Sequence, residues 1–220
     1  MKTTLRAIAH LLGYPDAELR AHLAEVRDAL HAERALTSGR LAEIDALLDR
    51  IAALAALEAE AEYVELFDRG CATSLPLFEH VHGDSRERGP AMIGLVRTYE
   101  QAGLLLAPGE LPDHLPVLLE YASTQPPEAA RELLREVAHL LRLLCSALAR
   151  RHSEYAALVG ALLDLAGESV ESVELADEPA LDQAWEEPAV FDGCTNAGRQ
   201  AQQPVRVVRR AAANAPGASA

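Results

Sequence analysis

Apolar residues recur with a helical spacing between about residue 126 and residue 151. Five apolar residues are separated by four, three, four and four positions: Leu133, Val137, Leu140, Leu144 and Leu148. This spacing places them on one face of an α-helix and is incompatible with a strand, in which every second residue faces the same side. We therefore predict an amphipathic helix here, with the first four of these residues buried.

Six further segments are predicted to be helical, because their apolar residues share this period and glycine or proline bounds several of them. They are residues 3–12, 16–36, 40–67, 85–102, 113–125 and 153–166. Half of the 220 residues are hydrophobic and 4% are aromatic, so leucine and alanine must build the core. We predict an all-α fold, a single bundle of about seven helices over residues 1–167.

The composition changes after residue 167. Nine acidic residues and no Lys or Arg lie between Glu168 and Asp192, with Trp185 in the main apolar cluster. Residues 168–193 are therefore predicted to be an acidic segment anchored by Trp185. Residues 194–220 are rich in Ala, Gly, Gln and Pro, and we predict that this tail is disordered.

Charge and motif content favour a binding protein over an enzyme. The net charge of −14 argues against a nucleic-acid partner and favours a basic one. Cys71, Cys145 and Cys194 are too far apart to suggest a zinc site, an iron–sulfur cluster or a disulfide framework. The sequence shows no signal peptide, no apolar run of about 20 residues, no phosphate-binding glycine motif and no serine nucleophile motif. We expect a cytoplasmic protein without a cofactor or stable membrane insertion; its oligomeric state stays open.

Carboxylates surround an aromatic pair in the third predicted helix. The acidic residues are Glu58, Glu60, Glu62, Glu65 and Asp68. Tyr63 and Phe67 are spaced four apart and so lie next to each other on a helix. This pattern is typical of a solvated face beside core aromatics, but it would also suit a basic amphipathic helix. In the second interpretation, Tyr63 and Phe67 anchor the helix and Glu62, Glu65 and Asp68 meet its basic residues.

Histidines offer an alternative chemistry. His80 and His82 form a His-x-His pair, and His114 with Asp113 or Glu79 could complete a zinc site. A metal-dependent hydrolase using His80, His82, Asp113 and His114 is therefore an alternative. Nothing in the sequence brings His114 beside His80, and histidines in such loops more often make hydrogen bonds.

A compact turn contains Glu110, Pro112, Asp113 and His114. Asp113 is suited to cap the helix that follows it. The turn could also be a hinge whose polar groups face a cavity between two helical halves. The capping role accounts for Asp113 but not for Glu110 and His114 together.

Four segments together resemble the nitrate reductase molybdenum cofactor assembly chaperones, the NarJ family, within the broader TorD/DmsD-like redox-enzyme maturation chaperones. The specific matches are residues 11–15, 62–70 with 74–89, 110–116 and 181–188. The resemblance covers about residues 3–192, and the segment 110–116 is similar to the hinge motif of the broader family.

The resemblance implies an all-helical cytoplasmic chaperone without catalytic activity. Its partner would be the apo catalytic subunit of respiratory nitrate reductase, bound through a basic amphipathic N-terminal peptide and held for molybdenum cofactor insertion before membrane docking. The residues expected to bind this peptide are Glu62, Tyr63, Glu65, Phe67, Asp68, Phe78, Glu79, His80 and His82. Glu110, Pro112, Asp113 and His114 would form the hinge.

Overall fold

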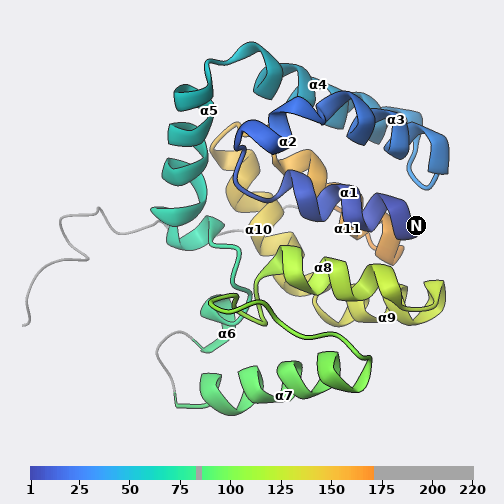
Figure 1. The fold of residues 1–220 in the computed structure, drawn as a ribbon, viewed down its shortest axis with the longest axis vertical. Coiled ribbons are helices and arrows are strands. Elements are labelled where there is room, and N and C mark those ends of the chain that lie inside the picture. Colours follow the sequence, from blue (N-terminus) through green and yellow to red (C-terminus); the bar gives the residue numbers. More distant parts are fainter. Residues whose placement is uncertain (83–85, 171–220) are drawn as a thin grey trace, which may run out of the picture. The chain divides into compact units, whose positions relative to one another are not determined.

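The computed structural model describes residues 1–82 and 86–170, and it confirms an all-α fold. The chain divides into two units, Met1–Asp177 and Glu178–Ala220, and all described residues belong to the first. Trp185 and the segments 171–193 and 194–220, for which an anchor and a disordered tail were predicted, lie outside the described residues. The α-helices in this part of the chain (Figure 1) are α1 Lys2–Leu11, α2 Ala17–Ala21, α3 Leu23–Glu33, α4 Ser38–Ala53, α5 Ala56–Tyr63, α6 Glu79–His82, α7 Arg88–Gln101, α8 Leu115–Thr124, α9 Pro127–Glu136, α10 Ala138–Arg150 and α11 Ala156–Ala166.

The described residues form eleven α-helices and not about seven, because the three longest predicted helices are each divided and α6 is an added short turn. Interruptions fall at His22, at Leu54–Ala55 and at Val137. At the second, Leu54 is extended and Arg20 donates a hydrogen bond to its carbonyl oxygen over 2.7 Å. This side chain satisfies a carbonyl that the end of α4 leaves without a helical partner. The hydrogen bond from Arg20 of α2 thus stabilises the end of α4 at a point where the helical spacing of apolar residues continues in the sequence.

Helix α11 lies at the centre of the core and is apolar on nearly every side. Nine of its eleven residues are buried, and α10, α9, α4 and α1 pack around it. Asp164 is its charged residue, and it pairs with Arg40 of α4 at 2.8 Å. A helix that is hydrophobic all round has to be enclosed by others, which accounts for its position.

The break at Val137 corrects part of the predicted core. Leu140, Leu144 and Leu148 are buried as expected, whereas Leu133 and Val137 are only partly buried. Because α9 ends at Glu136 and α10 starts at Ala138, the helical phase changes between them. Leu134, the neighbour of the predicted residue, takes the fully buried position in α9.

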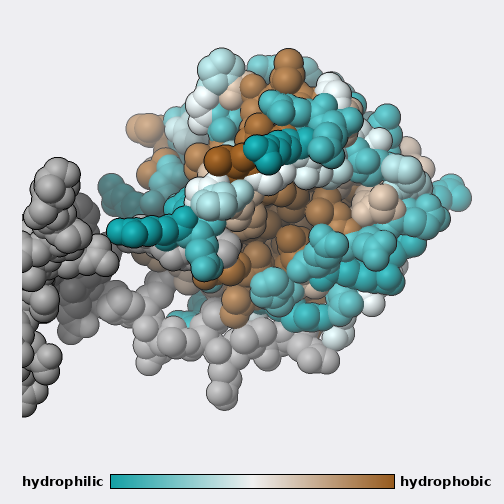
Figure 2. All heavy atoms as spheres, turned by 90° about the horizontal axis from the view of Figure 1, so that it is seen from below, coloured by the Kyte–Doolittle hydropathy of each residue, from teal (hydrophilic) through white to brown (hydrophobic). Residues whose placement is uncertain are grey.

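Helix α7 is the most loosely packed long helix. Tyr99 is its one fully buried residue, and Ile93 keeps 55% of its surface exposed. Figure 1 places α7 at one end of the unit, beyond α8 and α9. Seen from that end, apolar side chains gather in a hollow between more polar rims (Figure 2). None of the helices in the described ranges is long and apolar enough to cross a membrane.

Candidate peptide-binding groove

Tyr63 and Phe67 belong to the core, as in the first interpretation of this pattern, which corrects their expected role as direct anchors of a peptide helix. Their exposed fractions are 6% and 4%, and both rings contact Tyr155. The Tyr63 hydroxyl donates a hydrogen bond to the carbonyl oxygen of Leu12 over 2.9 Å. Burial raises the pKa of Tyr63 and of Tyr155 well above the usual value. The pair falls at the junction of α5 and the π-helix η1, Val64–Asp68. Its partners come from the residues just after α1 and just before α11, Leu12 and Tyr155.

The carboxylates beside this pair are partly neutralised. Glu62 forms an ion pair with Arg50 at 2.8 Å, and Glu65 forms one with Arg69 at 3.0 Å. All four side chains are well exposed, so each pair contributes little to stability. Asp68 is exposed and has no ion pair within the described part of the chain. Of the three expected carboxylates, Asp68 alone keeps an uncompensated charge there.

The loop 75–78 and the turn 113–115 lie side by side, joined by an antiparallel bridge between Pro76 and His114. The Leu77 amide donates to the Asp113 carbonyl oxygen, and the Leu115 amide donates to the Leu75 carbonyl oxygen, both over 3.0 Å. Two segments that resemble the family in sequence, about 35 residues apart, thus form one structural unit.

Asp113 does not cap α8, so the predicted N-cap is wrong. His114 occupies the N-cap position of α8, without a side-chain capping bond. Asp113 Oδ2 instead accepts a hydrogen bond from the Phe78 amide over 3.1 Å, just before α6. The side chain is buried, and its Oδ1 accepts no hydrogen bond from any residue that the structure describes. Asp113 therefore fastens the loop to the turn.

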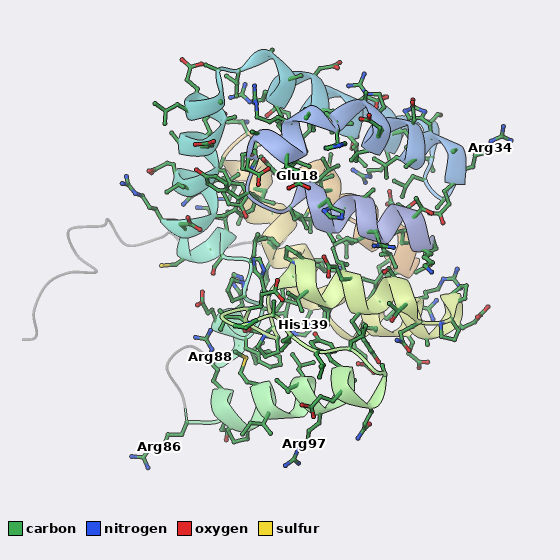
Figure 3. The ribbon with its side chains drawn as sticks, viewed as in Figure 1. Glu18, Arg34, Arg86, Arg88, Arg97 and His139 are labelled. Atoms are coloured by element: carbon green, nitrogen blue, oxygen red, sulfur yellow. The ribbon has the colours of Figure 1, made fainter. Side chains whose placement is uncertain are left out.

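Neighbouring polar residues hold α7 against the paired loop 75–78 and turn 113–115. Arg88 lies 3.3 Å from Glu79 and 3.9 Å from Asp113, and the Tyr99 hydroxyl donates to the Pro112 carbonyl oxygen over 2.7 Å. Glu79, Pro112 and Asp113 are thereby occupied in holding the loop, the turn and α7 together. Arg86 and Arg97, by contrast, point away from the body (Figure 3).

The metal-site alternative finds no support in this geometry. A ring nitrogen of His80 lies 2.8 Å from the Ser74 carbonyl oxygen, and Asp113 is engaged with the Phe78 amide. The side chain of His82 lies outside the described residues. Within the described ranges, no three His, Cys, Asp or Glu side chains are grouped to hold a metal ion.

Glu110 and His114 both line a groove between α8 and the α1–α3 segment. This part of the groove, which we name the acidic section, has a volume of about 560 Å³. Among the described residues, no Lys or Arg lines it; the lining residues are Ala9, His10, Gly13, Tyr14, Asp16, Glu18, Leu19, His22, Val26, Glu110, His114, Pro116, Val117 and Glu120. Figure 3 shows Glu18 where α2 approaches α1.

The acidic section is negative at neutral pH. Burial lowers the pKa of His114, although the nearby carboxylates of Asp113, Glu110 and Asp68 oppose this effect. His114 is therefore neutral at pH 7 and does not compensate the carboxylates.

Tyr14 is the exposed aromatic residue of the groove, and the sequence-based site did not include it. It is 46% exposed and lines the acidic section. Its ring meets the buried ring of Tyr63 edge-on, with 5.6 Å between the centroids. Its position between Gly13 and Pro15 could have indicated this exposure from the sequence, because a turn between two helices tends to present its side chains at the surface.

A second part of the groove, the apolar section, continues along α1 and α8 with a volume of about 350 Å³. It shares His10, Glu110, Val117 and Glu120 with the acidic section. Its other lining residues are Lys2, Arg6, Tyr99, Leu104, Leu105, Leu106, Tyr121, Ser123 and Thr124. Leu105 is 85% exposed at its edge. An apolar strip thus leads directly into a row of carboxylates.

This fold and groove define an all-helical protein with a partly apolar groove that is negatively charged in its acidic section. In a comparison with known families, residues 15–159 match the nitrate reductase delta subunit family, and the chain belongs to that family. The resemblance to NarJ-type assembly chaperones is therefore confirmed.

Individual relatives carry the same description. The chain is 44% identical over 193 residues to the nitrate reductase molybdenum cofactor assembly chaperone NarJ of Escherichia coli K12, covering 83% of this chain and 82% of that protein. It is 46% identical over 144 residues to the probable chaperone NarW of the same organism, covering 61% and 62%. The probable NarJ of Bacillus subtilis 168 is 37% identical over 163 residues, covering 73% and 86%.

Proposed function

We propose that this protein is a cytoplasmic assembly chaperone for respiratory nitrate reductase that binds the N-terminal peptide of the apo catalytic subunit in the groove. The names of its relatives support the chaperone role. One structural observation supports this location: the turn residues Glu110 and His114 converge with Asp16, Glu18 and Glu120 on a groove. In the part of the chain that the structure describes, no Lys or Arg lines its acidic section.

The groove suits a basic amphipathic helix. Val117, Tyr121 and the exposed Leu105 offer apolar surface to one face of the peptide, as in other helix-in-groove complexes. Tyr14 adds an aromatic contact at the acidic section, supported from behind by Tyr63. The carboxylates meet the basic residues of the peptide, which favours rapid encounter and rejects acidic sequences.

Of the residues expected from sequence to bind the client, we retain Asp68, which is exposed and has no ion pair with a described residue. Glu110 and His114, expected to form the hinge, are added because they line the groove. Glu62 and Glu65 already pair with arginines, and Tyr63 and Phe67 support the groove from within the core. Glu79 and Asp113 shape it by holding the loop and the turn together.

Binding would shift the catalytic subunit toward its bound form by mass action, and this requires no catalytic residue in the chaperone. While the peptide occupies the groove, it is withheld from other contacts, and the bound form of the catalytic subunit is stabilised relative to the free form. The molybdenum cofactor can then be inserted before the subunit docks at the membrane. Release follows once the completed subunit competes for its own peptide.

Calorimetric titration with the N-terminal peptide of the cognate catalytic subunit tests the proposal. Glu120→Lys reverses an exposed charge shared by both sections and should weaken binding by about tenfold or more at low salt, and by less at high salt. Glu132→Lys, exposed on α9 outside the groove, is the matched control and should leave binding unchanged. Equal affinities for the two variants would refute this location.

A further inference from the structure

The charges along the groove are arranged asymmetrically. Asp16 and Glu18 line the acidic section alone, whereas Lys2 and Arg6 line the apolar section alone. Helices α1 and α8 run antiparallel side by side (Figure 1), so these two pairs mark opposite ends of the same groove. Glu110 and Glu120 belong to both sections and lie between the ends.

The basic end is formed by the exposed stripe of α1. Lys2, Arg6 and His10 follow each other at intervals of four, which places them on one helix face. All three are exposed, and neither Lys2 nor Arg6 has an ion pair with a described residue. Glu25 lies across a neighbouring depression that these residues also line, so it weakens the positive field without cancelling it.

We infer that the groove fixes the direction of the bound peptide helix, with its N-terminal end at Asp16 and Glu18 and its C-terminal end at Lys2 and Arg6. The inference rests on the proposed function. A helix carries partial positive charge at its N-terminus and partial negative charge at its C-terminus, so only this direction is favourable at both ends. Basic residues near the peptide's N-terminus strengthen the same preference.

The dimensions of the groove define the peptide further. From Pro116 to Thr124, α8 lines it over eight residue steps, about 12 Å at a rise of about 1.5 Å per residue. About two turns of peptide helix therefore lie in the groove, with apolar residues at intervals of three or four facing Val117 and Tyr121. The partner is a helix with basic residues in its first turn and neutral or acidic residues in its last.

Spin labels on the peptide test the direction. The cognate N-terminal peptide is prepared with a nitroxide at its first or its last residue, and paramagnetic broadening of the protein's amide signals is measured by NMR. The first label should broaden signals of Ala17 and Glu18, and the last label those of Thr3 and Arg6. The reverse pattern would overturn the inferred direction while leaving the proposed function intact, whereas a peptide that does not bind would overturn both.

Charge reversal gives an independent test. Arg6→Glu should weaken the cognate peptide by about two- to fivefold, as expected for charges at helix ends. A peptide with lysine added at its last residue should recover most of this loss, but one with lysine added at its first residue should not. Arg97→Glu, a reversal on α7 that points away from the body, is the matched control. Recovery by the first-residue lysine alone would contradict the inference.

Discussion

The ring of Tyr14 stands at 84° to the ring of Tyr63, with 5.6 Å between their centroids. One ring is exposed at the groove and the other is buried, held by its hydrogen bond to the Leu12 carbonyl oxygen. Edge-to-face contacts of this kind contribute about 0.5–1.5 kcal/mol beyond buried area. The contact therefore links the groove to the aromatic core. Tyr14 is the surface residue of the pair and Tyr63 the core residue, a difference that the sequence does not show.

Replacing Tyr14 should affect binding more than folding. Tyr14→Ala removes an exposed contact surface and one side of the ring contact, so the peptide affinity should fall by about tenfold, as for an aromatic interface residue. The unfolding free energy should fall by no more than about 1.5 kcal/mol. Calorimetric titration and thermal unfolding measure the two effects separately. Unchanged affinity would remove Tyr14 from the binding surface.

Replacing Phe67 should lower the stability of the fold more than the peptide affinity. Phe67→Ala leaves a cavity beside Tyr63 and Tyr155 and should destabilise the protein by about 3–5 kcal/mol. At a temperature where the variant remains folded, its peptide affinity should be close to that of the wild type. A specific loss of binding without a lower melting temperature would restore Phe67 as a direct contact.

Removing the Asp113 carboxylate should loosen the loop. Asp113→Ala deletes the carboxylate that accepts the hydrogen bond of the Phe78 amide, at a cost of about 1–3 kcal/mol. Hydrogen exchange at Phe78 should accelerate markedly. Glu110→Ala is the control on the same turn, because its exposed carboxylate accepts a hydrogen bond from the Ala107 amide. Equal exchange rates in both variants would contradict the fastening role of Asp113.

Gly70 and Gly94 form a matched pair for testing backbone crowding. A Cβ at Gly70 would lie 2.7 Å from the Leu66 carbonyl oxygen, which cannot move without distorting η1. At Gly94, no described residue outside the helix's own backbone comes within 4 Å of such a Cβ. Gly70→Ala should therefore destabilise by about 1–3 kcal/mol. Gly94→Ala should stabilise α7 by about 0.5–1 kcal/mol. Urea unfolding of both variants measures the difference, and similar midpoints would refute the crowding.

Glu33 makes the stability of the fold depend on pH in the acidic pH range. Burial opposes its ionisation, but the Met1 amine, the Thr4 hydroxyl and the amides of Thr3 and Thr4 outweigh this and lower its pKa to about 2. A lowered pKa stabilises the folded state above the unfolded value of about 4.3. This contribution is lost as the pH falls from there through about 2.

Glu33→Gln should test this dependence. The variant should be less stable than the wild type at pH 7 by about 1–3 kcal/mol, because charged acceptors are replaced by a neutral amide. The difference should shrink steadily below pH 4 in urea unfolding measured across pH 2–7. A difference that does not change with pH would show that the carboxylate charge contributes nothing.

The sequence by itself determined the helical class, the family and the sign of the charge. Apolar spacing over residues 133–148 is a local property, and it survives any arrangement of the helices. The same spacing could not locate the break at Val137, because Leu133 and Leu134 both fit an apolar face until the neighbouring helices select one. Family resemblance covered the turn residues but could not show what they face.

Tertiary structure alone decided which residues form the groove. Tyr63 and Phe67 have the spacing of a surface pair as much as of a core pair, and enclosure by Leu12 and Tyr155 made them core. Asp113 looks like a helix cap, yet the loop from 35 residues earlier supplies its amide partner. Burial and long-range hydrogen bonds depend on segments far apart in the chain, and no local pattern contains that information.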